Sequence, residues 1–440
     1  MLPLYTAVLS QAQFGTADLI ISYVSLLTPL VGLQFDQGLF RFIIDERNDE
    51  SKQRNVFSSI IFANVLQIIL FEVIACGLAL IVKLDYFNYI LITIPIGILG
   101  SSILQFLRGR GQNIHYAVIS FLSATVQVFC NVLFLLVFDL KIDGLLLAMI
   151  IGNIVVVLYA VFVNKIYKYF SIRCIDVTTI KEVAQYSLPL LPNQFAWWVM
   201  NLSDRSILTV VIGAWANGIY SIANKFSSLF ITFYNYFNMA WTETLSISKT
   251  DTDLSRYIST MANTLFDIFF FADGLLVLSM PITFRLLIND SFSEAYWQIP
   301  ILLLAVFLQA IQGLYGAIYV AFKDSRSIAA SSSLAALINI VIDVSCVKYI
   351  GIYAASISTL VAFLFLTIFR YVDSSKYVNA KIDKVKLIRA VILEIGIMLV
   401  YYKNNTVLNL VAFLTFFIYA IKANYGYLYE MYTKIKHRKS

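Results

Sequence analysis

Two adjacent charged residues, Asp204 and Arg205, interrupt an apolar run, and Lys225 stands in the next one. A charged side chain at the bilayer centre costs about 2.5–3.5 kcal/mol on insertion scales, so such residues mark functional sites. An Arg guanidinium binds anionic oxygens as a bidentate fork, and a Lys ammonium acts as a mobile point charge. The three residues therefore predict a basic wall that stabilises an anionic group at membrane depth. The alternative is a structural lattice of ion pairs between two helices.

Polar residues continue along the same two runs at helical spacing. Asn201 precedes Asp204 by three positions, and Asn224 directly precedes Lys225. On helices otherwise rich in Leu, Ile, Val and Trp, a polar stripe faces protein or water rather than lipid. Adjacent helical positions point about 100° apart, so Asp204 and Arg205 need separate partners. We expect Asp204 either to hold the basic pair in place or to compete with the anion for it.

Three acids in other apolar runs, Asp267, Asp343 and Glu72, are candidates for binding a coupling ion. Polar groups at such depth also serve as hydrogen-bonding links between helices, worth about 0.6 kcal/mol on average. Glu72 and Glu394 are lone acids in hydrophobic surroundings, where burial favours the neutral form. Both interpretations stay open for these residues.

The composition is that of an all-α polytopic membrane protein. Of 440 residues, 60% are hydrophobic and 13% charged, against about 25% charged in soluble domains. Apolar runs of about 20 residues, the length that crosses the hydrocarbon core, predict thirteen complete spans. They lie near 15–35, 55–82, 88–107, 114–137, 144–164, 188–212, 218–241, 259–284, 299–322, 327–347, 351–370, 387–402 and 405–422.

Lys and Arg residues orient these spans. Most of the 32 lie in one alternating set of loops, Arg370 at the end of one run among them. Because cytoplasmic loops carry such an excess, the C-terminus is expected in the cytoplasm. The net charge of +6 then belongs to short loops and does not indicate a nucleic-acid surface. The loop at 36–54 is cytoplasmic on this map, so the span 15–35 starts outside.

Residues 1–11 are apolar but too short to cross a membrane. We expect them to be the outer half of a first helix that is truncated at the N-terminus. A weak internal repeat, GTADLIIS from Gly15 against GIYSIANK from Gly218, supports this alignment. The complete protein would then have fourteen spans with both termini inside.

No sequence signature of catalysis or of a cofactor is present. The chain lacks G-x-x-x-x-G-K-[ST] and G-x-S-x-G, so neither a P-loop ATPase nor a serine nucleophile of that motif is expected. Its two histidines and four cysteines show no ligand spacing, so no metal site or disulfide framework is expected. No loop is long enough for a soluble catalytic domain. We expect a protein that is not an enzyme and needs no cofactor.

The chain resembles the polysaccharide-type flippases of the multidrug/oligosaccharidyl-lipid/polysaccharide exporter superfamily. The runs SLPLLPN at 187–193, SDRSI at 203–207 and GIYSIANK at 218–225 look like that family's seventh and eighth helices. The run GLFR at 38–41 looks like the cytoplasmic end of its second helix. The resemblance is specific across roughly 188–245, and elsewhere it rests on span count and loop charge.

The resemblance implies two six-helix lobes around a central cationic cavity, with two extra C-terminal helices. On this chain the N-terminal lobe would be 1–164, with its first helix incomplete, followed by a cytoplasmic linker at 165–187. The C-terminal lobe would be 188–370, and 371–440 would hold the extra helix pair and a basic cytoplasmic tail. The absent front of the first helix departs from the family pattern.

The resemblance also implies a function. An undecaprenyl-pyrophosphate-linked oligosaccharide would move from the inner to the outer leaflet of the bacterial cytoplasmic membrane for O-antigen, lipopolysaccharide, capsule or exopolysaccharide assembly. Expected partners are this lipid-linked oligosaccharide, membrane lipids, a polysaccharide polymerase and chain-length machinery, but no nucleic acid. Arg41 would capture the head group at the cytoplasmic mouth. The other residues expected to bind substrate are Arg205, Lys225, Asp204, Asn201, Asn224 and Tyr220. Rocking of the lobes would alternate access.

Three alternatives remain. A drug/ion antiporter of the same superfamily would favour acidic cavity residues, whereas this chain offers basic ones. A lipid II translocase fits the span count, but the runs at 203–207 and 218–225 favour repeat-unit export. A membrane glycosyltransferase or polymerase would usually carry a large outer loop, and the chain has none.

Overall fold

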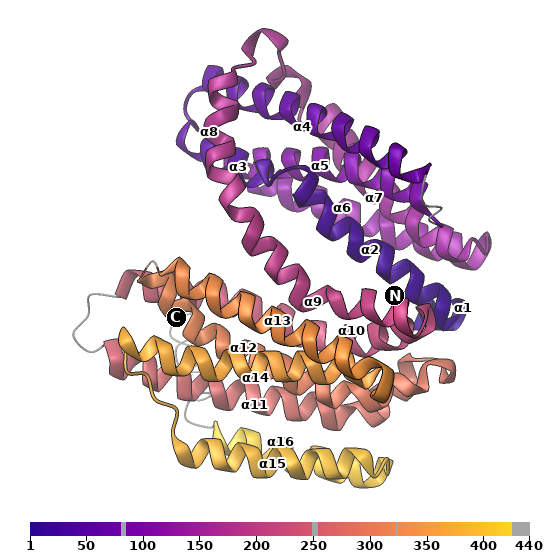
Figure 1. The fold of residues 1–440 in the computed structure, drawn as a ribbon, viewed down its shortest axis with the longest axis vertical. Coiled ribbons are helices and arrows are strands. Elements are labelled where there is room, and N and C mark those ends of the chain that lie inside the picture. The colour runs from indigo at the N-terminus through magenta and orange to yellow at the C-terminus, as the bar shows by residue number, and fades with distance from the viewer. Residues whose placement is uncertain (81–84, 249–253, 323, 425–440) are drawn as a thin grey trace, which may run out of the picture. The chain divides into compact units, whose positions relative to one another are not determined.

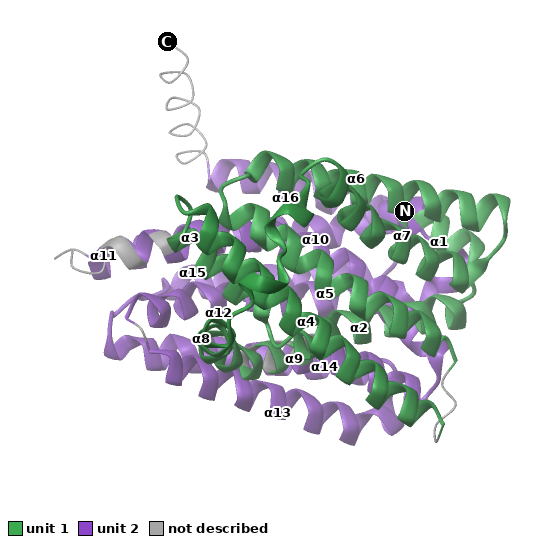
Figure 2. Ribbon diagram, turned by 90° about the horizontal axis from the view of Figure 1, so that it is seen from above, with its two compact units in different colours: residues 1, 3–198 green, residues 2, 199–440 purple. Residues whose placement is uncertain are grey.

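The computed structural model describes residues 1–80, 85–248, 254–322 and 324–424 (Figure 1). Regular secondary structure in these residues is helical throughout, as the composition predicts. Contacts divide the chain into two compact units, which Figure 2 colours separately. Unit 1 comprises residues 1 and 3–198, and unit 2 comprises residues 2 and 199–440. The basic tail expected at the C-terminus lies, from residue 425 on, outside the described residues.

Ten helices in the described residues are long and apolar enough to cross a membrane. The chain is therefore a multi-pass membrane protein, whereas the expected number of thirteen spans is not confirmed. The other three expected spans fall on α9 (Leu191–Val211), α10 (Ala214–Ser248) and α15 (Lys384–Tyr402). These helices carry charged residues such as Arg205 and Arg389, which lower their mean hydropathy.

Unit 1 is built from eight helices and the start of α9. Its helices are α1 (Leu2–Val8), α2 (Gln11–Val31), α3 (Phe35–Asp45), α4 (Glu50–Ala79), α5 (Phe87–Gly109), α6 (Asn113–Val132), α7 (Lys141–Phe162) and α8 (Val177–Ser187). A capping box starts α2: the Ser10 hydroxyl accepts from the Gln13 backbone N–H at 3.2 Å, and the Gln13 side chain accepts from the Ser10 backbone N–H at 3.0 Å. The side chains of Asp49 and Asp176 cap α4 and α8.

Helix α3 occupies much of the segment 36–54 that the hydropathy pattern assigns to a loop. Leu33 and Gln34, with φ of 50° and 56°, interrupt the helix between α2 and α3. Helix α3 then buries Phe35, Leu39 and Ile43 on one face. A short amphipathic helix of this kind contains no 20-residue apolar run, so a search for membrane spans does not detect it.

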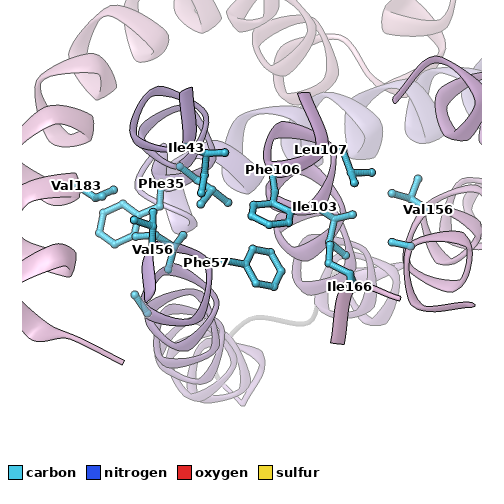
Figure 3. Packing of buried hydrophobic residues seen from close by; sticks show 14 of the residues in the cluster. Phe35, Ile43, Val56, Phe57, Ile103, Phe106, Leu107, Val156, Ile166 and Val183 are labelled. Atoms are coloured by element: carbon cyan, nitrogen blue, oxygen red, sulfur yellow. The ribbon is translucent and has the colours of Figure 1, made fainter. Parts of the chain in front are cut away.

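The hydrophobic core of unit 1 joins α3, α4, α5, α7 and α8 (Figure 3). At its centre the rings of Phe57 and Phe106 lie 4.3 Å apart between centroids. Gly38 lets α3 and α8 approach closely, because a Cβ at that position would lie 2.6 Å from a methyl carbon of Val183. Part of the segment 165–187, expected as a linker, thus packs as α8 onto α3 and α4. The expected lobe boundaries stay a prediction.

In its described residues, unit 2 contains the rest of α9 and seven further α-helices. They are α10 and α15, already defined, with α11 (Leu254–Leu287), α12 (Ile299–Ala321), α13 (Ser325–Ile350), α14 (Tyr353–Asp373) and α16 (Thr406–Ala423). Short 3-10 segments at Asp290–Gln298 and Ser374–Lys376 precede α12 and follow α14. Helix α12 is apolar nearly all round, which is typical of a buried helix, and it packs against α10, α11 and α14.

Two glycines of α12 accept large side chains from its neighbours. A Cβ at Gly313 would lie 1.6 Å from the Tyr234 hydroxyl of α10, and a Cβ at Gly316 would lie 2.6 Å from Nη1 of Arg370 in α14. Both side chains therefore occupy space that a Cβ would fill if either position held a residue other than glycine. The contact of α10 and α14 with α12 depends on these two positions.

Helices α15 and α16 lie along α11 (Figure 1). Near the N-terminal end of α11, the Asn263 amide donates to the Lys381 carbonyl and accepts from the Asp383 backbone N–H, both at 2.8 Å. At the other end Arg285 donates to the side chains of Asn404 and Thr406 at 3.2 and 2.9 Å. Because the residue numbers rise together along both helices, α11 and α15 run parallel.

Candidate functional site

Four helices of unit 2 meet around the carboxylate of Asp204, which is fully buried in α9. The Tyr220 hydroxyl of α10 donates a hydrogen bond to Oδ2 of Asp204 at 2.7 Å, and the Thr359 hydroxyl of α14 donates to the same oxygen at 2.8 Å. The charge of Arg205 also acts on this carboxylate. Hydrogen bonds to an ionised acceptor are about twice as strong as neutral ones. Asp204 therefore links α9 to α10 and α14.

Asn339 brings α13 into the same group. Its side chain satisfies its neighbours when the amide nitrogen faces Oδ1 of Asp204 at 3.2 Å and the Ser203 hydroxyl at 3.3 Å. Its oxygen then accepts from the Ser358 hydroxyl at 3.2 Å and the Thr359 backbone N–H at 3.3 Å. We call Ser203, Asp204, Tyr220, Asn339, Ser358 and Thr359 the Asp204 cluster.

Asp343 lies one turn beyond Asn339 on α13 and is fully buried. Neither of its carboxylate oxygens has a hydrogen-bond partner among the described residues, and the two acids Asp204 and Asp343 interact electrostatically. A small cavity of about 30 Å³ adjoins the cluster, lined by Tyr220, Asn224 and Thr359 among others. A cavity of this size holds about one water molecule.

This arrangement has the chemistry of a site for a proton or a small monovalent cation. Two buried acids provide charge, and an amide and hydroxyls supply neutral oxygen atoms beside them. Unpaired carboxylates away from water are costly, so the site gains stability when it takes up positive charge. In the part of the chain that the structure describes, no group of three or more His, Cys, Asp or Glu side chains could hold a metal ion.

The structure brings together only part of the predicted substrate-contacting set. Tyr220 belongs to the Asp204 cluster, and the half-buried Asn224 lines the cavity beside it. Arg205 is half-buried on α9, and Lys225 is exposed on α10. Asn201 lies in α9, but its side chain is outside the described part of the structure. The role of these residues stays a prediction.

Arg41 lies in unit 1, exposed near the end of α3. Its guanidinium donates to the Asp45 carboxylate one turn later at 2.5 Å, and this hydrogen bond raises the pKa of Arg41 above its usual value. Glu72 is half-buried on α4. Asp267 of α11 forms ion pairs with Lys386 and Arg389 of α15. Asp267 is thus neutralised by two cations, whereas Asp343 has no such partner among the described residues.

Arg370 is a buried cation that the sequence places among loop residues, because it ends an apolar run. Its side chain in α14 is 4% exposed. It donates to the Gln312 side chain at 2.6 Å, and to the hydroxyls of Ser331 and Ser332 at 3.3 and 2.9 Å. The sequence signal for this site is the presence of polar residues, Gln312, Ser331 and Ser332, within the apolar runs 299–322 and 327–347. The hydropathy profile does not show that a long cation is buried when its partners are neutral polar groups.

Unit 1 holds a second polar site next to α2 and α3. A cavity of about 160 Å³ is lined by Asp36, Asn64 and Ser102 among others. The Asn64 amide donates to the Ser102 hydroxyl at 2.8 Å. Asp36 accepts from the Gln37 side chain at 2.9 Å, and burial raises the pKa of Asp36. Asp36 was not among the predicted site residues, because it lay in the supposed loop.

Comparisons with known proteins agree with this fold. The profile of a family described as "Polysaccharide biosynthesis protein" matches residues 1–246. No curated protein matches the chain. A structure of the lipid II flippase MurJ in an inward closed conformation is 12% identical and covers 96% of both chains at a TM-score of 0.73. An inward-facing MATE family multidrug resistance transporter of the MOP superfamily is 13% identical at a TM-score of 0.71, over 86% of this chain and 93% of that one.

Proposed function

Because the chain belongs to the family of polysaccharide biosynthesis proteins and has the fold of MATE and MurJ transporters, we propose that it is a flippase for lipid-linked oligosaccharides. The substrate is an undecaprenyl-pyrophosphate-linked repeat unit, moved to the outer leaflet of the bacterial cytoplasmic membrane. The product serves O-antigen, capsule or exopolysaccharide assembly. The observation that carries the proposal is the family match across 1–246, which includes α9 up to Val211 and nearly all of α10.

The chemical task is to move a pyrophosphate through a medium that disfavours charge. An unpaired anion in hydrocarbon costs far more than a hydrogen-bonded one, so fixed cations along the path lower the barrier. Arg205 offers a bidentate fork to phosphate oxygens, and Lys225 offers a point charge. Arg41 stands at the predicted cytoplasmic side to meet the head group. No covalent bond changes in this process, so the protein acts as a transporter and not as an enzyme.

We place the coupling ion at the Asp204 cluster and Asp343. Uptake of a proton or monovalent cation there changes which hydrogen bonds Asp204 accepts from Tyr220 and Thr359. Since those donors stand on α10 and α14, the ion alters how these helices are held together. A binding event at this site would thereby bias unit 2 between two arrangements.

The test is glycan export in cells whose own flippase is deleted. Arg205→Ala and Lys225→Ala, at unchanged expression, are expected to abolish surface glycan. Lys348→Ala, an exposed cation at the far end of α13, serves as the matched control and should retain export. Unchanged glycan in both variants would refute the basic site.

A second candidate is transport of lipid II, favoured by the likeness to MurJ over 96% of both chains. Cells depleted of their lipid II flippase separate the two functions. The lipid II alternative would be favoured if the wild-type chain rescued growth of these cells but did not restore surface polysaccharide in the cells whose own glycan flippase is deleted. Restored polysaccharide without rescue supports repeat-unit export.

A further inference from the structure

Asp273 of α11 and Glu394 of α15 are buried acids on two helices that contribute nothing to the Asp204 cluster. Their side chains are 1% and 9% exposed. No oxygen of either carboxyl group has a hydrogen-bond partner among the described residues. The two acids interact with each other electrostatically. Glu394, a lone acid by sequence, thus has a second acid facing it from the parallel helix.

The surroundings of this pair are apolar. Gly274, next to Asp273, is packed by the Phe416 ring and the Ile397 side chain, which would lie 2.6 and 2.9 Å from a Cβ there. An ionised carboxylate in such surroundings is costly unless it is paired or hydrogen-bonded. Two ionised carboxylates would also repel each other. The pair therefore cannot hold two negative charges.

An ion-paired group lies toward the N-terminal ends of the same two helices. Asp267 precedes Asp273 by about 9 Å along α11, and Arg389 precedes Glu394 by about 7.5 Å along α15, at the helical rise. Asp267, Lys386 and Arg389 form one ion-paired group. Two cations and one anion leave a single positive charge. That charge balances one ionised carboxylate in the pair, so the other carboxyl must be neutral.

Among the side chains that the structure describes, the other elements packed against α11 carry Lys225 in α10, Lys422 in α16, and Asp290 and Glu294 in the 3-10 segment. None of these four is among the groups that act on Asp273 or Glu394. Helix α12 carries no acidic or basic residue. From α16 the Tyr419 ring contacts Phe271, and from α10 the Tyr234 ring contacts Phe269. Both contacts are made by aromatic rings. The protonation state of the pair is therefore set by the pair itself and by the ion-paired group.

We propose that Asp273 and Glu394 form a proton-binding site in which the two carboxyl groups together hold one proton. Binding converts a carboxylate and a free proton into a carboxylic acid, with no other bond changed. Loss of this proton leaves two like charges between α11 and α15 and drives these helices apart. Proton binding itself rests on the burial of both acids, their lack of hydrogen-bond partners among the described residues and the repulsion of two like charges. Its role in coupling rests on the proposed transport function and gives α15 and α16 a part in the cycle.

Infrared spectroscopy of the purified full-length chain tests the site directly. A protonated carboxyl has its own carbonyl stretching band, which shifts in D₂O. We compare the wild type at neutral pH with Asp273→Asn, Glu394→Gln and the double variant. Asp383→Asn is the matched control, because Asp383 is an exposed N-cap on the same helix and Asn caps a helix equally well.

One proton held by the pair makes a specific pattern. Each single variant is expected to lose the whole band of the pair, because the acid that remains is balanced by the ion-paired group and ionises. The double variant then loses no more than either single one, and Asp383→Asn keeps the band. Additive losses would mean two independently protonated acids, and no loss in either single variant would mean that neither is protonated. Both outcomes overturn the proposal.

A second measurement needs no substitution in the pair. Dicyclohexylcarbodiimide modifies protonated carboxyls in apolar surroundings, and peptide mapping locates the product. At neutral pH it is expected to label Asp273 or Glu394 and to spare Asp267. Labelling of neither member of the pair overturns the proposal.

Cells then separate this site from the transport function. Export of glycan by Glu394→Gln is expected to lose its response to collapse of the proton gradient. A wild-type chain that exports no glycan in the same cells would refute the proposed function, while the infrared result would still decide the proton site.

Discussion

Replacement of Gly313 by Ala should destabilise unit 2 through one contact. The new Cβ would lie 1.6 Å from the Tyr234 hydroxyl oxygen and 2.8 Å from its Cζ. Both distances are shorter than any tolerated carbon contact, so either the ring or α12 must move. Tyr234 is buried, and its ring packs edge-on against the Phe269 ring. Phe237 packs against the Phe269 ring as well. Little free space is therefore open to the displaced phenol.

The expected magnitude follows from two opposing terms. Ala in place of Gly inside a helix stabilises by about 0.5–1 kcal/mol, because the unfolded chain loses freedom. Overpacking of a core costs about 1–3 kcal/mol. We expect a net loss of roughly 0.5–2 kcal/mol in the free energy of unfolding. Tyr234→Phe should recover most of this loss, because it removes the atom at the shorter distance and the hydroxyl has no hydrogen-bond partner among the described residues.

The assay is the free energy of unfolding in detergent, measured by denaturant titration on both single variants and the double variant. Gly396→Ala on α15 is the control, because no atom lies within 4 Å of a Cβ at that position. It should gain about 0.5–1 kcal/mol. A Gly313→Ala protein as stable as the control would refute the tight contact. So would a Tyr234→Phe background in which the loss from Gly313→Ala is undiminished.

Three further predictions concern other contacts. Hydrogen bonds from the Thr178 and Thr179 backbone lower the pKa of Asp176, the cap of α8. The stability that this cap contributes is present above the unfolded pKa of about 3.9 and is lost as the pH falls through the lower folded pKa. Hydrogen exchange in α8 should therefore accelerate in that pH range, and Asp176→Asn should remove this pH dependence. Thr359→Val removes one hydrogen-bond donor to Asp204 and should lower the free energy of unfolding by about 1.5–3 kcal/mol. A denaturant titration that gives the wild-type value would contradict a hydrogen bond from Thr359 to an ionised Asp204. Arg370→Lys cannot reach three acceptors at once and should cost about 1–3 kcal/mol, which thermal unfolding measures and an unchanged midpoint would contradict.

Sequence alone locates the Asp204 cluster but not its contacts. Asp204 is conspicuous because a charge in an apolar run is costly, and Tyr220 lies on the next helix. Thr359, which donates to the same oxygen, lies 155 positions along the chain from Asp204. A hydroxyl costs little free energy in a membrane helix, so the sequence does not single out Thr359. Only the packing of α14 against α13 and α12 reveals its role.

Two errors of interpretation have the same cause. Arg370 ends an apolar run, where a long cation ordinarily extends to the interface, yet it folds back into unit 2. Asp273 stands within a run rich in Phe and Leu, so hydropathy does not mark it, although it interacts with Glu394. In each case hydropathy averages over a window, whereas burial depends on which neighbour a single side chain meets. The break between α2 and α3, at two residues with positive φ, is equally invisible to that average.

The parallel alignment of α11 and α15 sets a limit on how the chain can be shortened. A truncation after Arg370 would strip Asp267 of Lys386 and Arg389 and Asp273 of Glu394. Two acids of α11 would then face lipid instead of protein. Fusion tags and deletions that aim at a minimal transporter should therefore keep the chain at least through Ala423, the end of α16. The last two helices cover acidic residues of α11 that would otherwise be exposed to hydrocarbon.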